Sequence, residues 1–327
     1  MKNFLSRLGL TSILLLVFGQ WALGTIAAQP VSPPRHLWTH EVTDGSAYGL
    51  GISADGETLI TVIGFGFDLG GQIVSLDPAT GEVRWQVDTP ESASADPIIA
   101  GGVVYAGMGN LVGGGAAVYA LEATTGNELW RTDVENRTLP ATPIDAVTVS
   151  NGTLYVNRGD AVLLAIDAAS GNVRWELDLR KPSRGAPFVD GDTVYVSTGF
   201  DGARIFAFDV ETGEERWSVE DPENPVTGPV VADGLLFIPF VNGELVAYDP
   251  ASGEERWRAL AGVRDEEGDM DPWPGLPLVT GSVLFVSSNG FAGHTPSRSM
   301  PTREKKSGAF QLAISLPVPL RFLRISY

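Results

Sequence analysis

The chain has 327 residues, a formal net charge of −18 at pH 7 and no cysteine. The absence of cysteine excludes disulfides, metal–thiolate sites, a cysteine nucleophile and a lipid anchor attached through cysteine. Between residues 29 and 297 the chain carries 14 basic and 39 acidic side chains, a charge that repels nucleic acid and anionic membranes. Such a surface favours solubility, cationic partners or high salt, and simple solvation of the acids also accounts for it.

The first 28 residues have the layout of a secretory signal peptide. Lys2 and Arg7 precede an apolar run over residues 8–18, and small residues continue to Ala28. The alternative is a membrane anchor, but this run is about a dozen residues long, whereas a spanning helix needs about 20. We therefore expect cleavage after Ala28, an extracytoplasmic protein (periplasmic or secreted), and no transmembrane span after cleavage.

The next segment, RHLWTHEV (35–42), is predicted to be a strand that carries Trp38. After it, one phrase recurs five times, and its tryptophans are spaced 45, 45, 42 and 40 residues apart. The five copies are IVSLDPATGEVRW (73–85), VYALEATTGNELW (118–130), LLAIDAASGNVRW (163–175), IFAFDVETGEERW (205–217) and LVAYDPASGEERW (245–257). A fixed period of this length indicates a chain built of repeated supersecondary units.

Each copy of the phrase predicts a β-hairpin. An apolar strand leads to an acid, the acid and a following Thr or Ser bond the backbone of a tight turn, and a glycine supplies the positive φ that other residues resist. The acids are Asp77, Glu122, Asp167, Asp209 and Asp249. The glycines are Gly81, Gly126, Gly171, Gly213 and Gly253, and the tryptophans are Trp85, Trp130, Trp175, Trp217 and Trp257.

The repeated tryptophans are predicted to be structural. A large ring that recurs at one register of one strand suits the seam between adjacent sheets, where its burial stabilises the fold by about 1.5–3 kcal/mol or more. The alternative is a row of five residues that stack on a ligand.

A second pattern alternates with the first. A turn followed by an apolar strand begins at each of six places: Ala54, Ala100, Ser150, Val189, Ala232 and Thr280. Asn-Gly and Asp-Gly between apolar runs are strong hairpin signals. One period therefore holds four short antiparallel strands, A to D, and we predict an all-β fold, a β-propeller of about six blades. Five repeats are complete, and we expect the N-terminal strand with Trp38 to complete the partial sixth blade.

The C-terminal residues 295–327 depart from the repeat, because the acid-Thr-Gly phrase is missing and residues 298–327 carry six Lys or Arg and one Glu. In one interpretation GAFQLAISL (308–316) supplies the missing strand C of the last blade and RFLRISY (321–327) another strand. In the other, this divergent basic tail is a non-native end, and the array was truncated from a seven- or eight-bladed ring. The propeller itself is expected over 29–294.

Few residues remain to carry chemistry. The three histidines, His36, His40 and His294, do not suggest a catalytic triad, and the glycines of 107–115 do not fit a phosphate-binding loop. The most suggestive segment is RDEEGDMDPWPG (264–275), which follows strand D of the fifth repeat. Its carboxylates offer oxygen ligands of the kind that Ca²⁺ takes, and Trp273 is a candidate for stacking on a flat ligand. The candidate metal ligands are Asp265, Glu267, Asp269 and Asp271, with Glu266 beside them.

The phrases ALEATTGNELW (120–130) and AIDAASGNVRW (165–175) resemble the tryptophan-docking repeat of the pyrroloquinoline-quinone-like (PQQ-like) propeller superfamily. The resemblance covers about residues 35–290 and is specific for the fold, not for function. This superfamily includes quinoprotein alcohol dehydrogenases, which are eight-bladed and depend on quinone and Ca²⁺, and BamB-type outer-membrane assembly factors, which are non-catalytic lipoproteins. The chain lacks the paired cysteines of many of the former and the lipidated cysteine of the latter, so the resemblance assigns no catalytic or cofactor residue here.

Two functions follow as expectations. The first is a non-catalytic binding or scaffold module whose protein or small-molecule partner binds at the D–A and B–C loops, which share one face of a propeller. The alternative is a PQQ- and Ca²⁺-dependent alcohol or sugar dehydrogenase, or a fragment of one, which the acidic loop with Trp273 favours.

Overall fold

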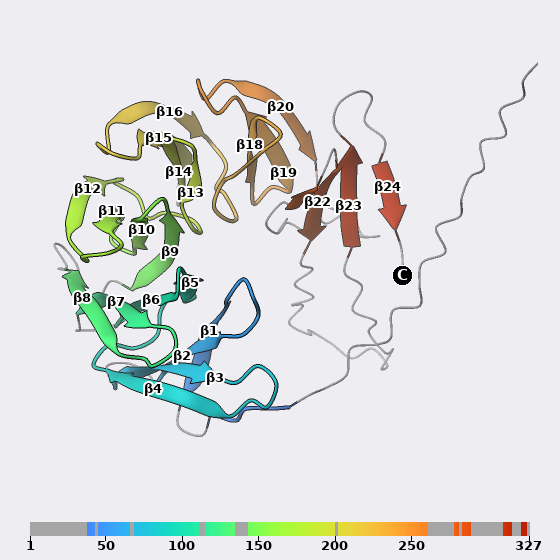
Figure 1. The fold of residues 1–327 in the computed structure, drawn as a ribbon. Helices are drawn as coiled ribbons and strands as arrows, with labels where there is room; N and C mark the ends of the chain where they lie inside the picture. The colour runs from blue at the N-terminus through green and yellow to red at the C-terminus, as the bar shows by residue number, and fades with distance from the viewer. Residues whose placement is uncertain are drawn as a thin grey trace, which may run out of the picture. The chain divides into compact units, whose positions relative to one another are not determined.

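The computed structural model describes residues 38–42, 45–65, 69–110, 115–134, 143–199, 202–260, 278–280, 283–288, 310–315 and 322–325. These residues form strands and turns, and 24 strands are ordered along the chain as labelled in Figure 1. Within the described ranges, no helix is long and apolar enough to cross a membrane.

The strands form six antiparallel sheets of four, and in each sheet the strands follow one another in chain order, A to D. The first sheet has β1 (Ser46–Ile52), β2 (Leu59–Gly64), β3 (Gly71–Leu76) and β4 (Val83–Thr89). The second has β5 (Ile98–Ala100), β6 (Val103–Gly109), β7 (Ala116–Glu122) and β8 (Glu128–Val134). The third has β9 (Ile144–Ser150), β10 (Thr153–Arg158), β11 (Val162–Asp167) and β12 (Val173–Asp178).

The fourth sheet has β13 (Phe188–Asp190), β14 (Thr193–Thr198), β15 (Ala203–Asp209) and β16 (Glu215–Asp221). The fifth has β17 (Val230–Ala232), β18 (Leu235–Pro239), β19 (Glu244–Tyr248) and β20 (Glu255–Leu260). The sixth has β21 (Leu278–Thr280), β22 (Val283–Ser288), β23 (Phe310–Ser315) and β24 (Phe322–Ile325). The six A–B turns and the five C–D hairpins predicted from the sequence are therefore confirmed.

The outer strand of the sixth sheet corrects one prediction. We expected the N-terminal segment 35–42 to complete the last blade, but residues 38–42 form no strand. Instead β24 pairs with β23, with Ile314 opposite Phe322, so the hydrogen-bonding edge of β23 is occupied by a strand from the C-terminal segment. The expectation that 308–316 and 321–327 supply strands agrees with β23 and β24.

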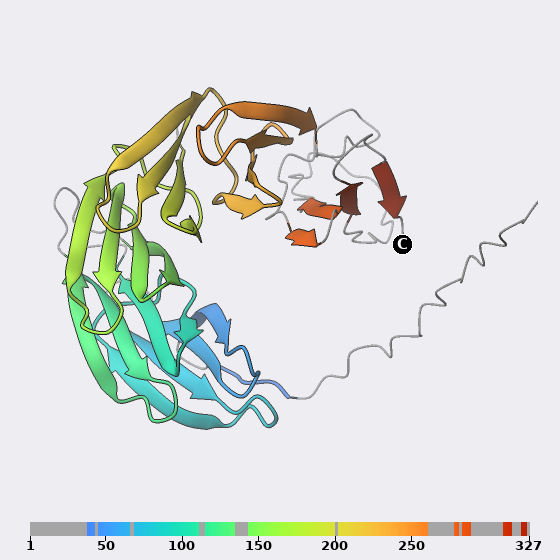
Figure 2. The ribbon, with the colours of Figure 1, turned by 45° about the horizontal axis from the view of Figure 1, so that its top comes forward.

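The hydrophobic core lies between consecutive sheets. One cluster joins the first and second sheets through Val62 and Tyr119, and another joins the second and third through Val118 and Leu154. Further clusters join the third to the fourth sheet and the fourth to the fifth. Figure 2 shows β9–β12 between β5–β8 and β13–β16. Strands B and C are buried on both faces for this reason: every residue of β2, β10 and β14 is buried.

The outer D strands alternate instead. In β4 and β8 the charged and polar residues face solvent at every second position, while Trp85 and Trp130 are half-buried. This period-two pattern is the one expected for a strand with one packed face and one solvated face. It places the tryptophans on the face that meets the next sheet.

The acid of each repeat organises its turn. In the first repeat the Asp77 carboxylate accepts hydrogen bonds from the backbone N–H groups of Ala79 and Thr80, at 2.8 and 3.0 Å. Its carbonyl oxygen accepts a bond from the N–H of Gly81 at 2.8 Å, and Gly81 has a φ of 74°. The same bonds recur at Asp209 and Asp249, so the local sequence fixes the hairpin.

Candidate functional site

The D–A connections and the B–C turns lie at the same end of each sheet. Antiparallel order requires this, because A–B and C–D turns fall at the opposite end. Isolated bridges show the arrangement directly: Ser183 of one D–A connection pairs with Thr198 at the end of strand B of the fourth sheet, and Pro225 pairs with Phe240 in the fifth. We call this end the loop face.

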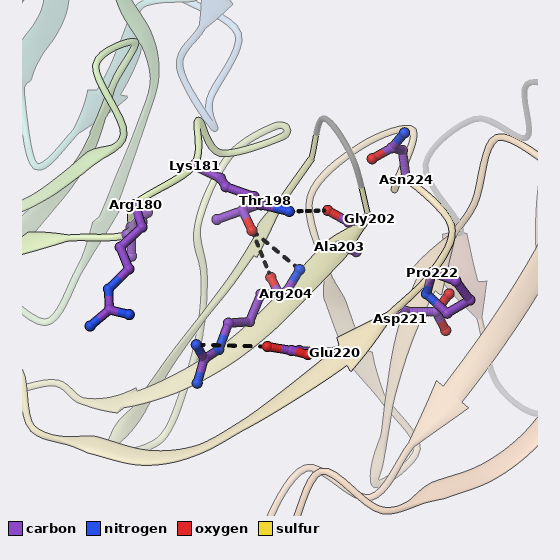
Figure 3. Close-up of a pocket in the computed structure, with 11 residues that line it drawn as sticks. Arg180, Lys181, Thr198, Gly202, Ala203, Arg204, Glu220, Asp221, Pro222 and Asn224 are labelled. Atoms are coloured by element: carbon purple, nitrogen blue, oxygen red, sulfur yellow. Dashed lines mark hydrogen bonds and ion pairs between the residues drawn. The ribbon is translucent and has the colours of Figure 1, made fainter.

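The loop face holds a cavity of about 650 Å³ over the fourth sheet (Figure 3). Arg180 and Lys181 come from the connection after β12, and Thr198 and Arg204 from the ends of β14 and β15 that flank the B–C turn of the fourth sheet. The opposite side is formed by the segment after β16, with Asn224. Three stretches far apart in the sequence therefore build one cavity, and all three are loop-face elements.

Two hydrogen bonds hold the B–C side of this cavity in place. The Thr198 hydroxyl accepts a bond from the Arg204 backbone N–H and donates one to the Arg204 carbonyl oxygen, both at 3.2 Å. The Lys181 ammonium donates to the Gly202 carbonyl oxygen at 3.3 Å, which ties the D–A connection to the B–C turn. Figure 3 shows these contacts and the separate position of Arg180.

Arg204, near the start of β15, has an incomplete set of partners. One Arg204 guanidinium nitrogen donates to Ser218 at 2.8 Å, and another lies 4.0 Å from Glu220, whose side chain is 81% exposed. The Arg204 Nε and the Asn224 Oδ1 are buried without a hydrogen-bond partner. Buried polar atoms usually have partners, and these two stand out among the residues that line the cavity.

By contrast, the buried acid of the cavity is satisfied. The Asp221 carboxylate accepts bonds from Arg258 at 2.6 Å and from the Tyr248 hydroxyl at 3.2 Å. It also accepts the backbone N–H of Glu223 at 2.9 Å. Burial first, and then the neighbouring Asp221 carboxylate, raise the pKa of Tyr248, so the phenol stays protonated and donates. Asp221 is therefore a structural acid that holds the connection after β16.

A second polar cluster lies at the loop-face end of the third sheet. Arg158 and Asp160 form an ion pair at 2.6 Å, and each side chain is only 2% exposed. The Asp145 side chain reaches solvent, yet most of its surroundings are protein, and this desolvation raises its pKa to about 6. Arg184 opposes the rise and the Asp160 carboxylate adds to it. Asp145, Arg158 and Asp160 thus place three charged side chains at the loop-face end of the third sheet.

The repeat residues predicted from the sequence lie together between neighbouring sheets. Trp130 donates from its indole N–H to the Ala168 carbonyl oxygen at 3.0 Å and lies against Gly171 of the next repeat. The same pairing relates Trp38 to Gly81, Trp85 to Gly126, Trp175 to Gly213 and Trp217 to Gly253. Trp257 contacts Phe237 of its own sheet, with ring centroids 5.8 Å apart.

The predicted ligand-binding residues of segment 264–275, namely Asp265, Glu266, Glu267, Asp269, Asp271 and Trp273, lie outside the described residues, as do His36 and His294. Within the part of the chain that the structure describes, no group of three or more His, Cys, Asp or Glu side chains could hold a metal ion. The described residues therefore offer no fitted site for Ca²⁺, and we assign no chemistry to a bound cofactor.

The sequence analysis missed two features. Arg180, Lys181 and Arg204 were not singled out, because Arg204 is more than 20 residues from the Arg180-Lys181 pair and only the fold places all three in the lining of one cavity. It also missed the arginine that precedes the tryptophan in four repeats and binds the turn acid, as Arg84 binds Asp77 at 2.8 Å. The Arg-Trp pairs in VRW and ERW are the signal that could have revealed it.

Comparison with known families defines the class of protein. The family model described as outer membrane protein assembly factor BamB matches residues 29–142 and 114–310. The chain therefore belongs to this family of PQQ-like β-propellers.

Solved structures agree on the fold. The crystal structure of BamB from Moraxella catarrhalis is 19% identical, with a TM-score of 0.55 over 82% of this chain and 81% of that one. A europium-containing methanol dehydrogenase is 14% identical, with a TM-score of 0.57 over 88% of this chain and 73% of that one. The quinohemoprotein alcohol dehydrogenase ADHIIG from Pseudomonas putida HK5 is 15% identical, with a TM-score of 0.55 over 83% and 59%. No match was found among curated proteins. At these identities the likeness supports the fold alone.

Proposed function

We propose that the protein is an extracytoplasmic, non-catalytic binding module of the BamB type, and that its loop face binds a protein partner. The cavity over the fourth sheet carries this proposal, because it gathers polar atoms without partners at the end of the sheets where loops from three stretches meet. The family description, an outer membrane protein assembly factor, supports a scaffold role over catalysis.

The location rests on the N-terminal sequence. Residues 1–28 have the charged, apolar and small-residue regions of a signal peptide. N-terminal sequencing of the exported protein should therefore begin after Ala28. A mature chain that retains Met1 and stays with the membrane would contradict this part of the proposal.

Site-specific photo-crosslinking in the native host tests the binding face. A photoreactive residue at Pro222, which is exposed beside the cavity, should give a discrete adduct with one partner. The matched control is Asp55, which is exposed in the A–B turn of the first sheet at the opposite end. Adducts of equal yield from both positions, or from Asp55 alone, would contradict a partner site on the loop face.

The alternative function is a dehydrogenase that depends on PQQ and Ca²⁺, and only the acidic segment 264–275 with Trp273 favours it. The purified protein is tested with added quinone and Ca²⁺ against a panel of alcohols and sugars. A binding module should leave a redox dye unreduced. Reproducible dye reduction would overturn the non-catalytic proposal, whereas an unchanged melting temperature with quinone would count against the enzyme.

A further inference from the structure

Arginine in this protein usually has an acidic partner. Four arginines bind the acid of their own turn: Arg84, Arg174, Arg216 and Arg256. Arg131 and Arg258 bind Glu91 and Asp221, and Arg158 binds Asp160. Structural pairing thus accounts for these cations, and cations that lack it are the ones to examine for a binding role.

Arg180 is such a cation. Its side chain is exposed and, among the described residues, has no hydrogen-bond or ion-pair partner. Its backbone has a φ of 64°, a left-handed conformation that a non-glycine residue adopts at a cost. The backbone N–H of Arg180 donates to the Asp178 carboxylate at 2.7 Å, which holds this conformation. Glycine adopts this left-handed conformation at less cost, so the arginine at position 180 is not explained by its backbone conformation.

Arg180 shares its cavity with two other cations. Lys181 is the only lysine between residues 29 and 297, and it lines the same cavity as Arg180 and Arg204. A second cavity of about 300 Å³ is also lined by Leu179, Arg180 and Arg204, and it adds the apolar side chains of Leu177 and Phe206. Arg204 itself lies over the Phe206 ring, 5.1 Å from its centroid.

We propose that these two neighbouring cavities, whose linings share Arg180 and Arg204, form a carboxylate-binding site. Arg180, Lys181 and the unpartnered Arg204 Nε supply positive donors, and the unpartnered Asn224 Oδ1 accepts a donor of the ligand. Guanidinium groups suit carboxylates because they present paired N–H donors in a plane. The overall charge of −18 favours cations, and acidic residues also line the two cavities (Glu220 and Asp221 in the first, Asp178 and Glu215 in the second). An anion is therefore held here by direct contacts with the basic side chains and not by the long-range field.

This inference rests on the proposed binding role of the loop face and names the chemistry of the ligand. The carboxylate has two sources, a free organic acid or an acidic side chain of a protein partner. Calorimetric titrations of the full chain at constant ionic strength separate them. One titration uses citrate, which stands for a free organic acid. The other uses a peptide of alternating Glu and Leu, which stands for an acidic protein segment, and a peptide of alternating Gln and Leu is its uncharged control.

The site predicts saturable binding of at least one acidic probe and at least tenfold weaker binding of the Gln peptide. Citrate binding alone identifies a free acid, and tighter binding of the Glu peptide identifies an acidic protein segment. The proposal is overturned when neither acidic probe binds, or when the Glu and Gln peptides bind equally.

The decisive variant is Arg180→Gly, because glycine relieves the left-handed backbone while it removes the cation. Its melting temperature should be unchanged or higher, and its affinity for the acidic probe should fall at least tenfold. The matched control is Asn151→Gly, which relieves a φ of 47° in the turn between β9 and β10, outside the cavity. Wild-type affinity in Arg180→Gly, or an equal loss in Asn151→Gly, would overturn the site.

A chemical readout does not depend on calorimetry. Acylation of the Lys181 amine, followed by mass spectrometry, should slow in the presence of the bound acid, and the same reaction without the acid gives the unprotected rate. The outcomes also separate this inference from the proposed function. If citrate binds but Pro222 gives no crosslink, the carboxylate site stands and the proposed protein partner is refuted. If no acidic probe binds the wild-type protein, and Pro222 still gives crosslinks in Arg180→Gly, the carboxylate site is refuted and the proposed scaffold function stands.

Discussion

Trp130 lies against Gly171 so closely that a Cβ atom added at Gly171 would stand 2.8 Å from the indole ring. Gly171 also has a φ of 74°, and its carbonyl oxygen accepts a hydrogen bond from Thr132 at 2.6 Å. The two residues belong to consecutive sheets, so this contact joins one repeat to the next. The glycine of the phrase thus serves its own turn and the tryptophan of the preceding repeat.

The contact predicts that Gly171→Ala is more harmful than a turn glycine alone explains. Gly152→Ala is the matched control, because Gly152 has the same φ of 74° but nothing within 4 Å of an added Cβ. Gly152→Ala should cost about 1–2 kcal/mol for the left-handed backbone. Gly171→Ala should cost about 1–3 kcal/mol more, from overpacking against the indole. Urea unfolding of both variants measures the difference, and equal costs would mean that the indole moves aside freely.

Removal of the ring tests the same contact from the other side. Trp130→Ala should destabilise the protein by about 3–5 kcal/mol, since it leaves a cavity between sheets and removes the shorter of the two hydrogen bonds to the Ala168 carbonyl oxygen, which then keeps only the Tyr105 hydroxyl at 3.4 Å. In that background Gly171→Ala should lose its steric part, so the double variant costs less than the sum of the singles. Binding of the acidic probe should be unchanged. A stable variant that selectively loses binding would mean that the repeat tryptophans contact a ligand.

The repeat made the sheets predictable because its signals are local. Asp77, Thr80 and Gly81 encode their turn within five residues, and the turn bonds are the ones expected. The outer strand of the sixth sheet was not predictable in this way. The segment with Trp38 and the segment 321–327 were both candidates for this strand. Pairing between distant segments depends on tertiary context, which a local motif does not encode.

The candidate site was hidden from the sequence for a related reason. Arg180 and Asn224 lie in two D–A connections and Arg204 near the start of β15, and nothing in their sequence neighbours distinguishes them from solvated polar residues. Only the fold shows that, among the described residues, Arg180 lacks an acidic partner while Arg84 and Arg174 have one. The repeated Arg–acid ion pairs make an arginine without such a pair stand out, and only the three-dimensional structure shows which arginine that is.

Acid should destabilise the protein through the turn carboxylates. The hydrogen bond from Arg216, followed by backbone N–H bonds, lowers the pKa of Asp209 from 3.8 to about 2, and Arg84 does the same for Asp77. A lowered folded pKa contributes stability that is present above the unfolded value and is lost as the pH falls through the folded value. The contribution of these turn carboxylates to the urea midpoint should therefore be constant from neutral pH to about pH 4 and fall toward pH 2.

Arg216→Met tests this assignment, since it removes the largest cause of the low pKa of Asp209. The variant should lose part of the stability at pH 7 and show a shallower fall in acid. Its control is Arg180→Gly, which removes an arginine that binds no turn acid. Parallel acid profiles for wild type and Arg216→Met would show that the pair does not contribute to acid sensitivity.

The buried pair of Arg158 and Asp160 should behave differently from the turn pairs. Both side chains are 2% exposed and 2.6 Å apart, with Glu176 as a more distant partner at 3.7 Å. Arg158→Met leaves the Asp160 carboxylate buried without its cation and should cost about 3–5 kcal/mol, and Asp160→Asn should cost a comparable amount. The double variant should cost less than either single, because two apolar or neutral groups replace a desolvated pair. Urea unfolding at pH 7 measures all three. Single costs below about 1 kcal/mol would instead match a solvent-exposed ion pair and contradict the burial of this one.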